Sequence, residues 1–156
     1  MRSTKTDIPD APHTPADAPA DAPADAPGAA APTSTRTAPV IAPWLSVPDA
    51  TAAVAYYTEA FGAEVVQRLE NDNGGTEVAQ LDIAGARFWV QNDPDAVVAN
   101  SPVRMILTVD DPDAAYAQAI AAGATEVYPV YDGHGWRVGR LADPSGHHWE
   151  LGKPLA

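Results

Sequence analysis

The sequence contains no cysteine. This absence excludes a disulfide framework, a thiol nucleophile and a zinc–thiolate site. Basic residues are also scarce, because 9 Lys and Arg stand against 21 Asp and Glu and give a formal net charge of −12. Binding to nucleic acid without sequence preference needs a basic face that displaces counterions, so we expect no nucleic-acid partner.

Long apolar stretches are missing too. No apolar run approaches the roughly 18 residues that are needed to span a bilayer. The start, residues 1–7, is followed by Pro, Asp and Ala and not by the hydrophobic segment of a Sec signal peptide. We therefore expect a soluble, acidic, cytoplasmic protein with no membrane partner.

The prolines that are present are distributed unevenly. Nine of the 16 fall within the first 43 residues, and residues 16–28 repeat Ala-Asp-Ala-Pro. A proline at every fourth position costs a helix about 3 kcal/mol each time, and alanine offers too little apolar area for a core. We predict that residues 1–38 form a disordered tail with polyproline-II character and that residues 39–156 form a domain. Sixteen acids and six bases give that domain a charge of −10.

The domain begins with a clear strand and helix. Residues 43–47 alternate between the two faces of a strand. Asp49 is a suitable N-cap for an amphipathic helix over residues 50–61, and Gly62 is a suitable C-terminal stop.

The same pattern recurs about 60 residues later. Residues 103–109 read as a strand, Asp111 as an N-cap and Pro112 as the first helical residue. The second helix is expected to run to about Ala122, where Gly123 ends it. Further matches at offsets of 60 to 62 residues extend this repeat beyond the helices.

Each copy therefore reads as strand, helix, strand, strand, strand. We predict an α+β fold of two repeated βαβββ modules, at about residues 40–93 and 102–153. One such unit alone leaves a sheet face and sheet edges uncovered, so we expect the two modules to pack together and to leave a cleft.

Four phrases of the domain carry a family resemblance. They lie at residues 45–49, 57–63, 121–125 and 143–151, the last reading Asp-Pro-Ser-Gly-His-His-Trp-Glu-Leu. From about Ala42 to Pro154 the chain resembles the vicinal oxygen chelate superfamily of glyoxalase I, bleomycin-resistance proteins and extradiol dioxygenases. The resemblance implies a curved mixed sheet of eight strands around a ligand cleft, often within a homodimer. Function within such a family has to be argued from the site.

The resemblance also implies where a divalent metal would be held. Its ligands would be a His five residues before the first-strand valine of each module and a Glu in each last strand. These positions hold Ala42 and Arg104 in place of the two His, and Trp89 and Glu150 in the last strands. Since only Glu150 can ligate, we expect no metal cofactor. The alternative is a rearranged divalent-metal site that uses Glu150, His148 and Gln80.

Period-two alternation from Glu150 predicts which side chains face the cleft. The predicted ligand-binding residues are Trp44, Gln80, Arg87, Trp89, Arg104, Trp136, Arg140, His148 and Glu150. Arg104 or Arg140 could neutralise Glu150, but one carboxylate cannot balance three guanidinium groups. The surplus indicates either a cleft that is open to water or an acidic group on the ligand. Tryptophan faces suit a planar ring, although they could equally be hydrophobic filling.

Three functions remain open on this evidence. The favoured one is a metal-free protein of the bleomycin-resistance type that binds a small aromatic or amphipathic molecule. The arginines of the cleft favour an acidic molecule. The second is a divergent metal-dependent lyase, isomerase or dioxygenase of the glyoxalase type. The third is an accessory domain that oligomerises without chemistry. The sequence assigns no catalytic residue, and it has no Gly-x-Ser-x-Gly nucleophile motif.

Overall fold

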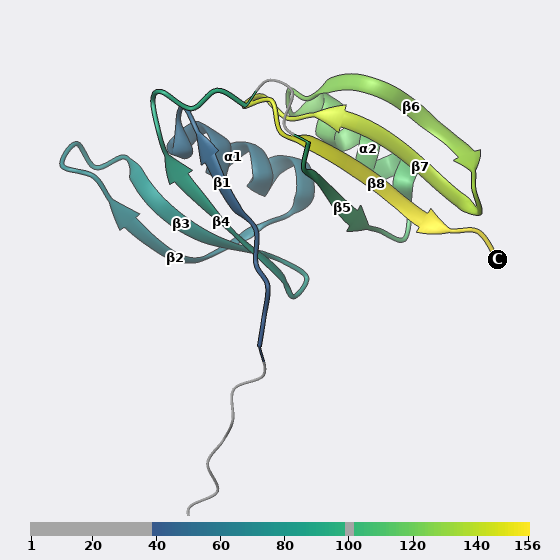
Figure 1. Ribbon diagram of the computed structural model, residues 1–156, viewed down its shortest axis with the longest axis horizontal. Coiled ribbons are helices and arrows are strands. Elements are labelled where there is room, and N and C mark those ends of the chain that lie inside the picture. Colours follow the sequence, from purple (N-terminus) through teal and green to yellow (C-terminus); the bar gives the residue numbers. More distant parts are fainter. Residues whose placement is uncertain (1–38, 99–101) are drawn as a thin grey trace, which may run out of the picture. The chain divides into compact units, whose positions relative to one another are not determined.

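The computed structural model describes residues 39–98 and 102–156, and each module follows the order β-α-β-β-β (Figure 1). The predicted disorder of residues 1–38 lies outside the described residues and stays a prediction. The elements of the first module are β1 (Trp44–Val47), α1 (Ala50–Phe61), β2 (Glu64–Glu70), β3 (Thr76–Ile83) and β4 (Ala86–Asn92). Those of the second are β5 (Arg104–Thr108), α2 (Pro112–Ala121), β6 (Thr125–Gly133), β7 (Trp136–Ala142) and β8 (His148–Pro154).

The helices begin and end at the predicted signals. The Asp49 side chain accepts a hydrogen bond from the Ala52 amide at 3.0 Å, which satisfies one of the free N–H groups of the first turn. Asp111 caps α2 in the same way, through the Ala114 amide at 3.1 Å. Gly62 ends α1 in the left-handed conformation at φ 65°, which glycine adopts without steric cost. Neither helix of the described ranges is long and apolar enough to cross a bilayer.

The eight strands are divided between two sheets. The strand order is β1-β4-β3-β2 in the first sheet and β5-β8-β7-β6 in the second. The first strand of each module pairs in parallel with the last, and the other pairs are antiparallel. The α+β class and the repeated βαβββ modules are confirmed, but the single eight-stranded sheet is replaced by two sheets of four strands.

Each sheet has one face covered by its own helix. Helix α1 packs on β3 and β4, and α2 packs on β7. The side chains on these covered faces are apolar and fully buried, as at Leu81, Val90, Leu141 and Leu151. We call the opposite side of each sheet its open face.

The two modules meet through their helices and through a buried carboxylate. The Gln118 amide of α2 donates to the Glu59 carbonyl of α1 at 2.6 Å. Asp143, which is 4 % exposed, accepts from the Tyr57 hydroxyl at 2.6 Å and from the Trp149 indole at 3.0 Å. Burial, together with the Asp143 charge, raises the pKa of Tyr57 well above its ordinary value, so this hydroxyl remains a donor. These contacts fix the second module against the first.

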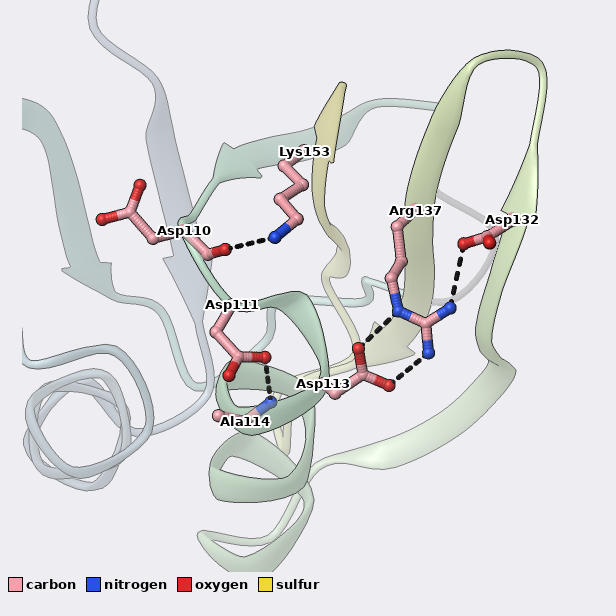
Figure 2. Close-up of polar contacts among 7 residues, drawn as sticks. All are labelled: Asp110, Asp111, Asp113, Ala114, Asp132, Arg137 and Lys153. Carbon is pink, nitrogen blue, oxygen red and sulfur yellow. Dashed lines mark hydrogen bonds and ion pairs between the residues drawn. The ribbon is translucent and has the colours of Figure 1, made fainter. Parts of the chain in front are cut away.

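Charged contacts tie α2 to the hairpin of β6 and β7 on the covered side (Figure 2). Figure 2 shows Arg137 of β7 binding Asp113 through two nitrogens and Asp132 through a third. The hydrogen bond from Arg137 lowers the pKa of the Asp113 carboxyl below its usual value. The same view shows the Lys153 ammonium donating to the Asp110 carbonyl at 2.8 Å. Arg137 is thus engaged on the helix side of its strand, whereas Arg140 of the same strand lies on the open face.

Candidate ligand-binding site

The predicted site residues are distributed over both open faces. Trp44, Gln80 and Trp89 occupy neighbouring positions on the first sheet, where Trp89 lies opposite Trp44 and Gln80. The two indole rings stack with their centroids 5.6 Å apart and their planes 23° apart. The Trp44 indole nitrogen donates to Gln91 at 2.8 Å, and the Trp44 side chain is half exposed. This face therefore presents aromatic rings and amides.

Arg87 is not a surplus cation. Its guanidinium donates to the Asp82 carboxylate at 2.9 Å across the β3–β4 hairpin. The hydrogen bond from Arg87 lowers the pKa of Asp82, and a second bond from the Gly85 amide acts in the same direction. The prediction of three guanidinium groups for one carboxylate was wrong, because it omitted Asp82, which shares the face of Gln80 by alternation. Two arginines remain on the predicted face with one carboxylate between them.

Those two arginines converge on Glu150 at the open face of the second sheet. Arg104 of β5 donates to Glu150 Oε1 at 2.7 Å. Arg140 of β7 donates to the same oxygen through Nε at 3.0 Å and through a terminal nitrogen at 2.8 Å. Glu150 lies on β8, between β5 and β7, so the sheet register itself brings the three side chains together. The expected neutralisation of Glu150 by an arginine is confirmed, with both arginines taking part.

Aromatic side chains surround this charged cluster. The Arg140 guanidinium carbon lies 5.4 Å from the centre of the Tyr128 ring, within the range of a cation–π contact. Two adjoining hollows of about 460 and 450 Å³ share Tyr131, Val138, Arg140 and Glu150 among their lining residues. Trp136 and Arg104 line the second hollow. The volumes suit a small organic molecule.

The alternative metal site would combine residues from both sheets, and it stays a prediction. His148 and Glu150 alternate onto the same face of β8, and His148 lies opposite Arg104. Gln80 belongs to the other sheet. No group of three or more His, Asp or Glu side chains in residues 39–98 and 102–156 is arranged to hold a metal ion.

A larger hollow of about 750 Å³ lies at the junction of the two modules. It is lined mainly by apolar side chains, with Gln80, Asp82 and Arg87 as its polar groups. Ala42, where the resemblance implies a metal ligand, also lines it. Asp82 and Arg87 balance each other's charge, whereas the two arginines on the second sheet share a single carboxylate. This hollow therefore offers weaker recognition of a charged group than the arginine pair does.

Sequence reasoning missed two aromatic members of the site. Tyr128 and Tyr131 are exposed on the edge strand β6, opposite Arg140 and Val138. The pairing of β6 with β7 shifts register between Glu126 and Tyr128 and again before Tyr131. Such irregularities break the period-two alternation, so no simple sequence signal places these two rings on the same face.

Comparison with known proteins identifies relatives along most of the chain. The family model described as "Glyoxalase-like domain" matches residues 43–152. An uncharacterized protein of Mycobacterium bovis is 36% identical over 128 residues, which cover 75% of this chain and 84% of that protein. An uncharacterized protein of Mycobacterium tuberculosis has the same identity over 75% of each chain.

Solved structures share the fold at lower identity. TioX from a Micromonospora species is 27% identical, with a TM-score of 0.59 over 74% of this chain and 100% of that one. A gene product from Arabidopsis thaliana is 26% identical, with a TM-score of 0.60 over 75% and 100% of the two chains. The fosfomycin resistance protein FosX from Listeria monocytogenes is 18% identical, with a TM-score of 0.61 over 74% and 93%. This last likeness concerns the fold alone.

Proposed function

This chain belongs to the glyoxalase-like domain family, and we propose that it binds a small aromatic acid on the open face of its second sheet, without a metal. The observation that carries the proposal is the convergence of Arg104 and Arg140 on one oxygen of Glu150. This arrangement orders two guanidinium groups beside hollows that are large enough for a ligand.

Both arginines keep hydrogen-bond donors for a ligand. A guanidinium carries five N–H donors, and Arg104 uses one nitrogen on Glu150 while Arg140 uses two. Two positive charges against one negative charge give the cluster a net charge of +1. A carboxylate on the ligand would neutralise that charge and accept the remaining N–H groups in charge-assisted bonds. The local charge is thus opposite in sign to the −10 of the whole domain.

The surrounding rings favour an aromatic body on the ligand. Tyr128 is 56% exposed and Tyr131 48%, and both line the hollow beside Arg140. Large exposed rings next to a charged anchor provide area for offset or edge-to-face ring packing. The proposed ligand therefore combines a planar ring with a carboxylate.

The residues at this place do not fit a divalent metal. Glu150 is the one carboxylate among the family's ligand positions, and its Oε1 already accepts from two cations at 2.7 to 3.0 Å. A metal ion on Glu150 would lie beside both guanidinium groups and be repelled by them. We therefore propose binding without a metal-dependent step at this site. A homodimer and a cytoplasmic location stay predictions.

The test uses a probe that carries only the two proposed features, 3-phenylpropanoate. Replacing Arg140 removes the guanidinium that bonds Glu150 twice, so Arg140→Met should weaken binding of the probe at least about tenfold. Titration followed by ligand-observed NMR measures this, because the Kd of so small a probe is expected to be of the order of 1 mM.

The duplicated scaffold offers a matched control. Gln80 of β3 lies opposite Trp89 as Arg140 of β7 lies opposite Glu150. Gln80→Met should leave the Kd of the probe within about twofold of the wild-type value. Equal loss in the two variants, or no loss in Arg140→Met, contradicts the proposed site.

A further inference from the structure

The hydrogen bonds at Glu150 are unevenly shared between its two oxygens. All three bonds that reach its carboxylate from the described residues end on Oε1. Oε2 accepts no hydrogen bond from a donor in residues 39–98 and 102–156. The Glu150 side chain is 20% exposed and lines both hollows of the site, so its carboxylate is accessible to a ligand.

A bound ligand would cover Oε2 and remove it from water. A carboxylate oxygen that loses water without gaining a donor destabilises the complex, whereas a ligand donor at that oxygen forms a charge-assisted bond. A ligand that only satisfies the arginines therefore leaves one strong acceptor unmatched. The site favours a ligand that brings a donor as well as a carboxylate.

Charge decides what kind of donor this is. Arg104, Arg140 and Glu150 sum to +1, and a ligand carboxylate brings the sum to zero. A hydroxyl group adds a donor and leaves the sum at zero, whereas an ammonium group returns it to +1. Since like charges in a partly desolvated site repel, a neutral donor is the better match.

The Glu150 carboxylate also indicates where the donor of the ligand lies. The two oxygens of Glu150 are bonded to the same carbon, and Oε1 is where the arginines meet. The donor of the ligand must accordingly lie close to the ligand's own carboxylate, as a hydroxyl on the adjacent carbon does. We propose that the site selects an aromatic 2-hydroxy acid, with the carboxylate on Arg104 and Arg140, the hydroxyl donating to Glu150 Oε2, and the ring against Tyr128 and Tyr131. This inference rests on the proposed function and names the ligand class of the same site.

Three probes with one carbon skeleton test the inference. 3-Phenylpropanoate has no donor next to its carboxylate, 3-phenyllactate has a hydroxyl there, and phenylalanine has an ammonium. Wild-type protein should bind one enantiomer of 3-phenyllactate about tenfold more tightly than 3-phenylpropanoate, and phenylalanine less tightly than 3-phenyllactate. The fold-change corresponds to one hydrogen bond to a charged group.

The variant Glu150→Gln tests whether that preference comes from Glu150. The substitution removes the negative charge. With its amide oxygen toward the two arginines, Gln places an N–H2 donor where Oε2 was, and this group cannot accept from the ligand hydroxyl. The affinity ratio of 3-phenyllactate to 3-phenylpropanoate should fall from about tenfold to about one. A ratio cancels any general rise in acid affinity from the extra positive charge, and thermal unfolding checks that the variant is folded.

The outcomes separate the two proposals. If 3-phenylpropanoate and both enantiomers of 3-phenyllactate fail to bind wild-type protein, the proposed function is wrong. If 3-phenylpropanoate binds and neither enantiomer of 3-phenyllactate binds more tightly, the function stands and the hydroxy-acid inference is overturned. If phenylalanine binds most tightly, the preference for a neutral donor is overturned. Wild-type protein alone distinguishes these cases, even if Glu150→Gln does not fold.

Discussion

The open faces of the two sheets use one scaffold for different chemistry. The central row across the first sheet consists, from β1 to β2, of Trp44, Trp89, Gln80 and Gln67. The corresponding row across the second sheet, from β5 to β6, consists of Ile106, Glu150, Arg140 and Tyr128. Two indole rings and two amides in one module therefore correspond to an aliphatic side chain, a carboxylate, a guanidinium and a phenol in the other.

The covered faces differ far less. Leu81, Phe88 and Val90 of the first module correspond to Leu141, Trp149 and Leu151 of the second, and all six are buried. Helix packing requires apolar side chains at these positions in either module, since a buried polar group without a partner is costly. Positions on the open face are free of that requirement. Specific chemistry can thus reside in one module while the repeat of the fold is kept.

The largest expected effect concerns the turn that follows the third strand of each module. In the second module Asp143 is buried and accepts from Tyr57, Trp149 and the amides of Ser145 and His147. Asp143→Ala would leave the buried donors of Tyr57 and Trp149 unsatisfied and should lower the free energy of unfolding by about 3 kcal/mol or more. Urea denaturation followed by circular dichroism measures the change.

The first module supplies the matched control. Asp82, near the corresponding turn, has a side chain that is 18% exposed, and it binds Arg87 and the Gly85 amide. Asp82→Ala should shift the urea midpoint much less than Asp143→Ala. Comparable shifts would contradict the assignment of Asp143 as the buried link between the modules.

A smaller effect distinguishes the ion pairs of the two hairpins. Arg137 of the second module binds two carboxylates, Asp113 and Asp132, whereas Arg87 of the first binds one carboxylate within the described part of the chain, that of Asp82. Arg137→Met should therefore lower the Tm at pH 7 more than Arg87→Met does, although both losses are modest because these pairs are exposed.

The pH dependence of the Arg137 effect has a definite sign. Arg137 lowers the folded-state pKa of Asp113 below the ordinary value of about 3.9. The stabilisation is therefore present above about pH 4 and is lost as the pH falls through the folded-state pKa. Differential scanning calorimetry should show the Tm difference between wild type and Arg137→Met shrinking from pH 6 to pH 3. A difference that grows on acidification would contradict the ion pair as its cause.

The smallest effect lies in the two-residue hairpin turns. Ala84 has φ 50° before Gly85, and His134 has φ 52° before Gly135. Positive φ costs most L-residues energy, and Asn tolerates it better than Ala. Ala84→Asn should raise the free energy of unfolding by about 0.5 kcal/mol. His134→Asn should gain less, because His already tolerates this region better than Ala, and equal gains in urea denaturation would contradict this explanation.

Much of the fold could be predicted because its signals are local. The Asp49 and Asp111 caps, the Gly62 stop and the apolar pattern of each helix act within a few residues of the chain. The helix over residues 50–61 accordingly has the predicted bounds. The second helix ends at Ala121, one residue short of the expected end. The internal repeat predicted the remaining strands, because the strand pattern of one module could be compared with that of the other.

The candidate site could be predicted only in part. Alternation placed Arg104, Arg140 and Glu150 on one face, and the structure has all three in one hydrogen-bonded cluster. Alternation could not assign Tyr128 and Tyr131, because the register of β6 shifts twice along its pairing. The ligand assignment of the nine predicted residues stays a prediction.

The sequence by itself determined the two modules, their helix caps and the alternation of each strand, because these depend on interactions between residues that are near one another in the chain. The tertiary structure alone decided that the eight strands form two sheets, so that Trp44, Gln80, Arg87 and Trp89 belong to a different sheet from the Glu150 cluster. It also decided which charges meet: Arg87 with Asp82, and two arginines on one oxygen of Glu150. The physical reason is that strand pairing joins residues that are far apart in the sequence. The alternation of side chains along a strand specifies the face on which a residue lies, but not its neighbours on the adjacent strands.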